Sequence, residues 1–370
     1  MSGAKLSDAR TVHDIASAAS RAWPVSAAVR VALGDCVLEV ATNSEPLRAE
    51  LADYFKEFLC PERDPNVYIQ AYEAPAPELG LAFETKTPDP GKSKIKEEWA
   101  DLPDGRVVRK RLTGMIFAFG GGVNAAVGPC LANANQVINF VNNRFIERKL
   151  NEGCLLGHAA AVLHHGRGLA LAGFSGAGKS TLSLQLMSRG TTFISNDRVM
   201  LGDGPEGPVL YGVAKQPRIN PGTALNNPDL ASIVDPADRE DFLSLSEGDL
   251  WQLEHKYDAL IDVCYGPGRF RLQAPMDGLV ILNWKRGAGP AEARTVDPRK
   301  RSDLLPAFMK STGLFYLPGE NGGGDLGEDA YAAMLAKSAL IEIRGGVDFE
   351  LASEVCMRFL ESGELPEREG

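Results

Sequence analysis

A glycine-rich segment near the middle of the chain constrains its fold and function more than any other part. Residues 173–180 read Gly-Phe-Ser-Gly-Ala-Gly-Lys-Ser, which matches the pattern G-x-x-x-x-G-K-[ST]. Glycines let a backbone curl tightly, so that successive N–H groups point inward at an anion. Lys179, which we expect to face solvent when the loop is empty, adds a positive charge for nucleotide phosphates, and the Ser180 hydroxyl can bind Mg²⁺. The sequence therefore predicts a phosphate-binding loop made of Gly173, Phe174, Ser175, Gly176, Ala177, Gly178, Lys179, Ser180 and Thr181.

The residues on both sides of this segment have the order that such a loop requires. Residues 167–172 form an apolar run of strand length. Downstream, Leu182, Leu186 and Met187 line one face of a helix that Gly190 can end. The N-terminus of that helix would direct its partial positive charge at bound phosphates. A chance glycine-rich turn between core elements is the alternative, and the agreement of motif and context disfavours it.

Composition excludes several classes of protein. The chain has 370 residues, of which 44% are hydrophobic and 24% charged, as in a globular protein with room for two domains. Its net charge of −10 argues against binding nucleic acid over the whole surface. The six cysteines form no C-x-x-C pair and the five histidines show no metal-ligand spacing, so we expect reduced thiols. With no signal peptide and no membrane-spanning run, we expect a cytoplasmic protein without membrane or nucleic-acid partners.

The pattern of elements predicts two domains, residues 1–150 and residues 151–370. In the first domain, turn signals at 34–35 and 103–105 predict antiparallel hairpins, and residues 131–150 predict a long helix. This domain is expected to be a smaller α/β unit, and no catalytic constellation is recognisable in it.

A small basic cluster is the one concentration of charge that stands out in the first domain. We interpret it as a solvated strand face, with an anion or partner site as the less favoured alternative. The cluster consists of Arg106, Arg109, Lys110 and Arg111.

The second domain is expected to be an α/β unit with a mixed sheet. Residues 158–165 predict a strand, and the tight turn at 166–168 leads directly into the strand before the loop, so these two strands should be antiparallel neighbours. A plain βαβ nucleotide fold would have a helix at that point. Residues 191–197 predict the strand that follows the loop helix, the Gly- and Pro-rich region 202–230 predicts loops, and residues 259–264 predict a further strand.

Phosphoryl transfer needs a carboxylate beside such a loop. Asp197 is the best candidate, because it ends the strand after the loop helix, where a parallel neighbour would place it beside Ser180; a turn-forming Asp is the alternative. His158 could hydrogen-bond to Asp197 and tune it, or could be a partly buried structural histidine. Lys215 and Arg218 could clamp a phosphate or an anionic substrate, and a plain surface loop is an equal alternative.

The run from His158 to Val199 resembles the catalytic domain of bacterial HPr kinase/phosphorylases and, more loosely, the phosphoenolpyruvate carboxykinases. The spacing of four features carries this resemblance. They are His158 fifteen residues before Gly173, the turn at 166–168, the loop at 173–180, and the acidic strand end Asn196-Asp197. The first 150 residues show no recognised motif of the HPr kinase N-terminal domain.

The resemblance implies an HPr-kinase-related kinase that uses ATP and Mg²⁺. Residues 173–181 would bind the nucleotide phosphates, Ser180 and Asp197 would hold Mg²⁺, and His158 would lie beside the catalytic carboxylate. The chain departs from the family pattern at Asn196, where the family has a first aspartate that acts as general base. It also has Ser180-Thr181 in place of Ser-Glu, and the family's substrate-capture segment is not recognised between residues 200 and 215. Recognition of HPr and reverse phosphorolysis are therefore not carried over.

Three functions are compatible with these features. The leading hypothesis is a kinase that transfers the γ-phosphoryl group of ATP to a hydroxyl of a partner protein's serine or of a small metabolite. A nucleotide-dependent switch or regulatory ATPase without group transfer is the alternative, and Asn196 favours it. A transport or motor ATPase is disfavoured, because no ABC-type signature is present. The resembled family favours a homo-oligomer.

Overall fold

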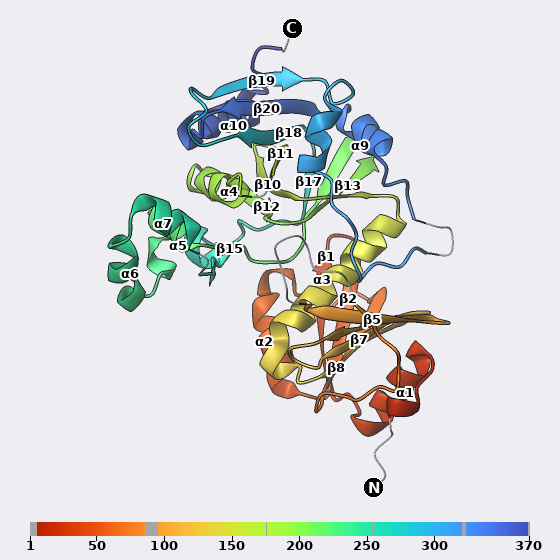
Figure 1. Ribbon diagram of the computed structural model, residues 1–370. Helices are drawn as coiled ribbons and strands as arrows, with labels where there is room; N and C mark the ends of the chain where they lie inside the picture. Colours follow the sequence, from red (N-terminus) through yellow and green to blue (C-terminus); the bar gives the residue numbers. More distant parts are fainter. Residues whose placement is uncertain (1–5, 86–94, 175, 254, 320–322, 369–370) are drawn as a thin grey trace. The chain divides into compact units, whose positions relative to one another are not determined.

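The chain folds into an α/β protein with mixed sheets (Figure 1). The structure is a computed structural model that describes residues 6–85, 95–174, 176–253, 255–319 and 323–368. The chain divides into two compact units. The first contains the residues up to Arg148 and the segment that begins at Thr312; the second contains Lys149–Ser311 and the segment from Gly323. None of the helices in the described ranges is long and apolar enough to cross a bilayer.

The described residues of the first unit form one mixed sheet in the order β1-β2-β3-β8-β7-β6-β5-β4. The expected hairpins are present, since β1 pairs antiparallel with β2, and β5 with β6. The strands are β1 (Ala27–Leu33), β2 (Cys36–Thr42), β3 (Val67–Glu73), β4 (Glu84–Thr85), β5 (Glu97–Leu102), β6 (Gly105–Lys110), β7 (Ile116–Gly120) and β8 (Val123–Gly128). The helices are α1 (Val12–Ala22), α2 (Glu45–Tyr54) and α3 (Ala134–Asn151), and α3 matches the long helix predicted for residues 131–150.

The basic cluster of the first unit lies on β6 and the residue after it. All four of its cations meet carboxylates of the neighbouring strand β5, which agrees with the strand-face interpretation. The pairs are Arg106–Asp101, Arg109–Glu98, Lys110–Glu97 and, at 3.9 Å, Arg111–Glu98. Cross-strand pairs of opposite charge stabilise a sheet, and they leave little free charge for an anion.

The second unit is built on a six-stranded sheet in the order β12-β10-β11-β18-β20-β19. The predicted antiparallel pairing of the two strands before the loop is confirmed, because β10 pairs antiparallel with β11. Strands β11, β18 and β20 run parallel, and β12 and β19 are antiparallel to their neighbours. The strands are β10 (Ala159–His164), β11 (Arg167–Gly173), β12 (Thr192–Ser195), β18 (Gly278–Trp284), β19 (Glu292–Val296) and β20 (Ala339–Gly345).

Both faces of this sheet are covered, so its central strands are almost entirely apolar. Helices α4 (Lys179–Ser188) and α10 (Phe349–Ser362) pack on one face, where Leu182, Leu186 and Phe359 are buried against β11 and β18. The 3₁₀ helix at Ser302–Ala307 and helix α9 (Glu328–Leu335) contribute to the core on the other face. A second sheet in the order β17-β14-β13-β9 completes that layer; its strands are β9 (Leu155–Gly157), β13 (Val199–Gly204), β14 (Gly207–Tyr211) and β17 (Gln273–Pro275).

The segment between β14 and β17 consists of short elements joined by loops. Strands β15 (Arg218–Ile219) and β16 (Tyr257–Asp258) pair with each other, and α5 (Pro221–Leu225) packs on α7 (Glu247–Gln252). Figure 1 shows α5, α6 and α7 grouped near β15. The remaining helices are α6 (Pro236–Leu243) and α8 (Ile261–Tyr265).

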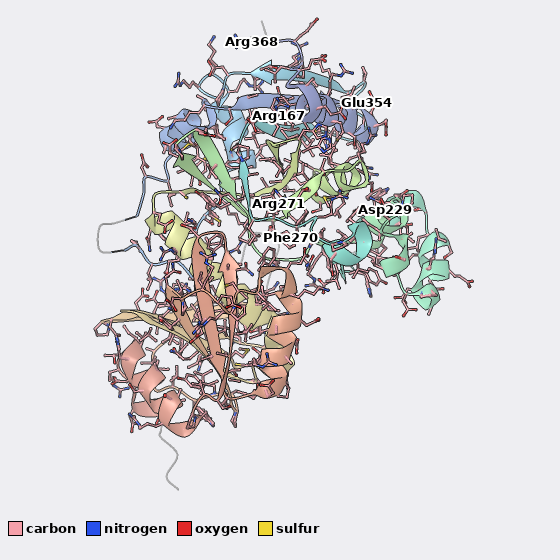
Figure 2. All side chains as sticks on the ribbon, turned by 180° about the vertical axis from the view of Figure 1, so that it is seen from behind. Arg167, Asp229, Phe270, Arg271, Glu354 and Arg368 are labelled. Carbon is pink, nitrogen blue, oxygen red and sulfur yellow. The ribbon has the colours of Figure 1, made fainter. Side chains whose placement is uncertain are left out.

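Several local predictions for this unit are wrong. The predicted strand at 259–264 is helix α8, because a short apolar run has no periodicity that separates strand from helix. The region expected to be loops contains the hairpin of β13 and β14, whose turn is set by Gly207 in a conformation with φ of 132°. Phe270, which Figure 2 labels, forms an isolated bridge with Phe193, and the centres of the two rings lie 4.8 Å apart.

Candidate functional site

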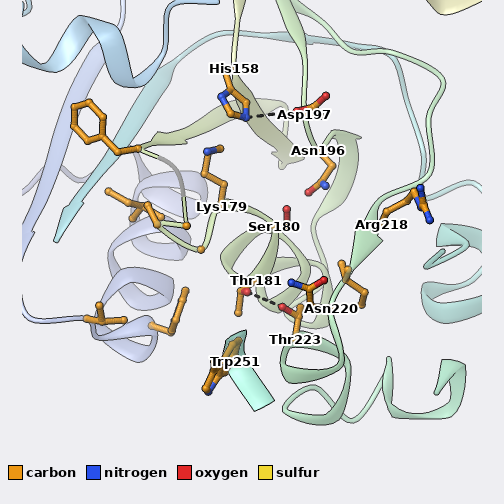
Figure 3. Close-up of a pocket in the computed structure, with 18 of the residues that line it drawn as sticks. His158, Lys179, Ser180, Thr181, Asn196, Asp197, Arg218, Asn220, Thr223 and Trp251 are labelled. Atoms are coloured by element: carbon orange, nitrogen blue, oxygen red, sulfur yellow. Dashed lines mark hydrogen bonds and ion pairs between the residues drawn. The ribbon is translucent and has the colours of Figure 1, made fainter. Parts of the chain in front are cut away.

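Three chain segments meet at one edge of the six-stranded sheet of the second unit. Strands β11 and β12 run in the same direction because both are antiparallel to β10, which lies between them. Their carboxyl ends and the start of β10 therefore share one edge. Strand β12 is thus not the adjacent parallel neighbour of β11 that the sequence suggested. Even so, the topology brings His158 and Asp197 to the edge where the glycine-rich loop begins (Figure 3).

A pocket of about 950 Å³ lies over this edge. Ser175 lies outside the described residues, and the Gly173 carbonyl is covered by Lys179 rather than lining the pocket. All the other predicted site residues line it: His158, Phe174, Gly176, Ala177, Gly178, Lys179, Ser180, Thr181, Asp197, Lys215 and Arg218. Each expected residue of the described chain therefore lies in or beside a single pocket.

The loop backbone has a conformation that glycine alone adopts easily. Gly176 and Gly178 have φ angles of 78° and 90°. A Cβ on Gly178 would lie 2.5 Å from the Phe349 ring, so the ring of α10 packs directly on the loop. The indole N–H of Trp284 donates to the Ala177 carbonyl at 2.9 Å, and its ring meets Phe349 edge-on at 5.1 Å. These two aromatic residues hold the loop, and no local signal in the sequence pointed to them.

The loop lysine does not face solvent, contrary to expectation. The side chain of Lys179 folds back over the loop and donates a hydrogen bond to the Gly173 carbonyl at 2.9 Å. The residue is only 9% exposed. Burial lowers the pKa of Lys179, and the nearby Asp197 carboxylate opposes that shift. Its ammonium group therefore has a carbonyl partner and one nearby carboxylate.

The predicted contact between His158 and Asp197 is present, and the imidazole in it is neutral. Nε2 of His158 lies 3.5 Å from Oδ1 of Asp197. Burial and the charges of Lys179, Lys310 and Arg198 lower the pKa of His158 to about 4, although Asp197 acts in the opposite direction. At neutral pH the geometry therefore describes a carboxylate beside a neutral imidazole rather than an ion pair. The other carboxylate oxygen of Asp197 lies 3.7 Å from Nε of Arg198.

The two predicted clamp residues differ in their environment. Arg218 meets Asp258 of β16 at 3.1 Å, and both side chains are more than half exposed. Lys215 forms no ion pair among the residues that the structure describes. Burial lowers the pKa of Lys215, and the Asp197 carboxylate counteracts this shift. Lys215 is thus a half-buried cation on the pocket wall without a direct counter-ion among the described residues.

Hydroxyl and amide groups close the side of the pocket next to α4. The hydroxyls of Thr181 and Thr223 lie 2.9 Å apart and join α4 to α5. The Oδ1 atoms of Asn196 and Asn220 are buried and accept no hydrogen bond from the described residues. The sequence showed Asn196 only as the loss of an acid, so its unpartnered oxygen is a feature that sequence reasoning missed.

The charge of the pocket suits an anion. Among the lining residues that the structure describes, Asp197 is the single carboxylate, against six cations: Lys179, Lys215, Arg218, Lys256, Lys285 and Arg286. This excess occurs in a chain of net charge −10, so the positive charge is concentrated locally. The described part of the chain holds no group of three or more His, Cys, Asp or Glu side chains suited to a metal ion. A cation here would need hydroxyl, amide or phosphate oxygens in addition to the carboxylate.

Comparisons with known proteins leave the family open. No family model matches the chain, and no curated protein matches it significantly. Among solved structures it is similar to the Hpr(Ser) kinase/phosphatase from Coxiella burnetii, with 11% sequence identity over 55% of this chain and 88% of that chain, at a TM-score of 0.28. Similarity at this score is weak and carries no argument for a shared activity.

Proposed function

We propose that this chain is a P-loop kinase that uses ATP and Mg²⁺ and is related to HPr kinase. The observation that carries the proposal is the meeting of a glycine-rich loop, a lysine and a carboxylate in one pocket of the second unit. Residues 151–370 would be the kinase domain, with the role of residues 1–150 unassigned. The protein would act in the cytoplasm, without nucleic-acid or membrane partners, as a homo-oligomer.

The loop residues Gly173 to Thr181 would hold the nucleotide phosphates. The left-handed glycines support this role, because they turn backbone N–H groups toward an anion at the N-terminus of α4. Lys179 is already positioned over the loop, so its ammonium group can exchange the Gly173 carbonyl for a phosphate oxygen. The excess of cations in the lining would balance the remaining phosphate charge.

The residues next to α4 fit a magnesium ion. Ser180 contributes a hydroxyl, Asp197 a carboxylate, and the buried amide oxygen of Asn196 has no other partner. These are the hard oxygen ligands that Mg²⁺ prefers, with nucleotide phosphates supplying the rest of its shell. When bound, Mg²⁺ would neutralise part of the phosphate charge.

In the transfer step, the acceptor hydroxyl oxygen forms a bond to the γ-phosphorus, and the bond between that phosphorus and the leaving oxygen of ADP breaks. Asp197 would orient the acceptor and take its proton. The neutral imidazole of His158, 3.5 Å from Oδ1, would position that carboxylate without neutralising it. Lys179 and Lys215 would stabilise the charge on the transferred group. The acceptor hydroxyl would belong to a protein serine or to a small metabolite.

A single-turnover experiment with γ-labelled ATP and Mg²⁺ tests the proposal. We would offer seryl peptides, sugars and water as acceptors to the wild type and to Asp197→Asn. Loss of the carboxylate should slow label transfer by about a hundredfold, the lower range for a general base, while affinity for a non-hydrolysable ATP analogue changes little. Equal losses in binding and transfer would make Asp197 a ligand only.

A nucleotide-dependent switch or regulatory ATPase is the second candidate. Asn196 favours it, because the strand end next to Asp197 lacks a second acid that could serve as a separate base. In the same experiment, tight binding of the analogue by the wild type without label on any organic acceptor supports this function over the kinase. Release of labelled phosphate to water would identify the ATPase form.

A further inference from the structure

An amide oxygen in the pocket lacks the partner that its burial requires. Oδ1 of Asn196 is buried and accepts no hydrogen bond from the described residues. A buried polar atom without a partner costs roughly 1–3 kcal/mol, so native structures almost always satisfy it with protein, water or an ion. Asn196 also lines the pocket, which makes a ligand the natural partner.

The direction in which the Asn196 side chain points indicates which chemical class of ligand it could bind. Figure 3 shows the side chain of Asn196 turned toward the Ser180 hydroxyl, between Asp197 and the start of α4. The amide oxygen and the carboxylate can only accept hydrogen bonds, and the hydroxyl oxygen also has lone pairs that can bind a metal. Such a set suits a divalent cation, because Mg²⁺, Mn²⁺ and Ca²⁺ all bind amide and carboxylate oxygens.

We propose that Asn196 Oδ1 is a direct ligand of a divalent cation, together with the Ser180 hydroxyl and the Asp197 carboxylate. The inference rests on the proposed function in so far as that cation accompanies a nucleotide. It assigns a role to the position where the resembled family would have an acid. The asparagine there is a neutral cation ligand rather than a lost base.

This ligand set has a consequence for the order of binding. Asp197 is the one carboxylate in the described part of the lining, which also holds six cations, so the pocket offers little negative charge to an isolated cation. Phosphate oxygens would supply the missing charge. The site should therefore hold a divalent cation weakly by itself and much more tightly when a nucleotide is present.

Asn220 provides an internal contrast. Its Oδ1 atom is also buried without a partner, but Figure 3 shows the residue beside Thr223 rather than turned to Ser180. We assign no cation contact to it. If unpartnered amide oxygens were merely a property of this pocket wall, replacing either asparagine would have the same effect on cation binding.

Mn²⁺ tests the assignment without any measurement of activity. Free Mn²⁺ would be titrated by its paramagnetic resonance signal against wild-type protein, with and without the β,γ-imido analogue of ATP. The variants are Asn196→Ala, the near-isosteric Asn196→Leu, and Asn196→Asp, which restores an oxygen ligand with added charge. Asn226→Ala is the matched control, since Asn226 is exposed at the end of α5 and lies outside the pocket lining.

We expect Asn196→Ala and Asn196→Leu to weaken Mn²⁺ binding in the presence of the analogue by about tenfold or more. Even the loss of a residue that contacts a metal only through one of its ligands typically lowers metal affinity by about tenfold to a hundredfold. Asn196→Asp should bind Mn²⁺ at least as tightly as the wild type, and Asn226→Ala should bind it equally. The apo protein with Asn196→Leu should unfold at the same temperature as the wild type or higher, because the apolar side chain removes an unsatisfied amide.

The outcome of this titration can overturn the assignment of Asn196 alone or together with the proposed function. Unchanged Mn²⁺ affinity in folded Asn196→Ala and Asn196→Leu, with analogue binding intact, overturns the assignment of Asn196 and leaves the kinase proposal standing. An equal loss in Asn220→Leu would also overturn it, because the effect would then belong to the pocket wall. A wild type that binds neither the analogue nor Mn²⁺ overturns both the assignment and the proposed function.

Discussion

The basic cluster of the first unit contrasts with two lysines that line the pocket of the second unit. In the first unit, Arg106, Arg109 and Lys110 each meet a carboxylate of the neighbouring strand. In the second unit, Lys179 has a carbonyl partner, and Lys215 has no ion-pair partner among the described residues. The residue types alone do not distinguish the two sets, since both consist of ordinary basic residues. The difference lies in what the fold places opposite them.

This contrast separates structural from functional charge. A cation paired across a sheet has its charge satisfied within the protein, and removing it costs stability alone. A buried cation without a counter-ion destabilises the protein by itself, so its presence is best explained by an anionic ligand that completes it. The comparison predicts that variants in the two sets will differ in the sign of their effect on stability and in their effect on nucleotide binding.

Replacing the loop lysine should have the largest effect. We expect Lys179→Ala to slow label transfer from γ-labelled ATP by about a thousandfold, the upper range for removing one preorganised charge at a reaction centre. Because Lys179 is held by a single carbonyl in the free protein, the variant should melt within a few degrees of the wild type. Full transfer activity in this variant would show that the pocket is not the site of reaction.

Replacing Lys215 should have a smaller effect than replacing Lys179. It should weaken binding of the ATP analogue but stabilise the apo protein. In Lys215→Met the stem is kept and the charge removed. Affinity for the ATP analogue, measured by calorimetry, should fall about tenfold, since a charge-assisted contact contributes about 1.5–3 kcal/mol. The apo variant should gain about 1 kcal/mol in free energy of unfolding, because a desolvated ammonium group is removed. A loss of stability instead would place Lys215 among the paired, structural cations.

The neutral imidazole of His158 should appear in the pH dependence of stability. An unfolded histidine takes up its proton near pH 6.5, whereas the pKa of His158 in the folded protein is lowered to about 4. Between these values the unfolded state binds more protons, so stability falls as the pH falls through this window.

Because the side chain is about a third exposed, we expect this histidine to account for only about 1 kcal/mol of stability lost between pH 7 and pH 5. The variant His158→Gln should lack that part of the loss in urea unfolding at the two pH values. Identical losses in variant and wild type would mean that burial and the pocket cations do not hold His158 neutral.

The smallest effect is expected from a paired cation of the first unit. Arg109→Ala removes the pair with Glu98 and the contact of its guanidinium carbon with the Phe83 ring, 3.9 Å from the ring centre. It should lower the free energy of unfolding by about 1 kcal/mol and leave the affinity for the ATP analogue unchanged. A drop in nucleotide affinity in Arg109→Ala would show that the paired cations of the first unit do not differ in function from the pocket lysines.

Local chemistry was enough to predict the parts of the site that lie close together in the chain. The turn at 166–168 is too short for a crossover, so it required the antiparallel pairing of β10 and β11 that is observed. The order of strand, loop and helix around residues 173–180 followed from glycine and leucine spacing. The contact of His158 with Asp197 was expected as well, although β10 rather than a direct pairing of β11 and β12 brings it about.

What the sequence could not predict depends on distant parts of the chain. Trp284 and Phe349 reach the loop from strands and helices more than a hundred positions away, and no local spacing signals such a contact. The burial of Lys179 depends on the carbonyl to which its side chain donates a hydrogen bond, and the tertiary packing of the loop determines which carbonyl that is. Residues 261–265 form a helix although their apolar run is equally compatible with a strand.

The packing of Phe349 against Gly178 connects two segments of the second unit that lie far apart in the sequence. The loop motif is only eight residues long, yet the ring that packs on it belongs to a residue that is synthesised long after the loop itself. A nascent chain that stops before residue 349 has the complete motif but lacks this support. If the loop binds phosphate as we propose, it would gain this support only late in synthesis, once α10 has packed on it.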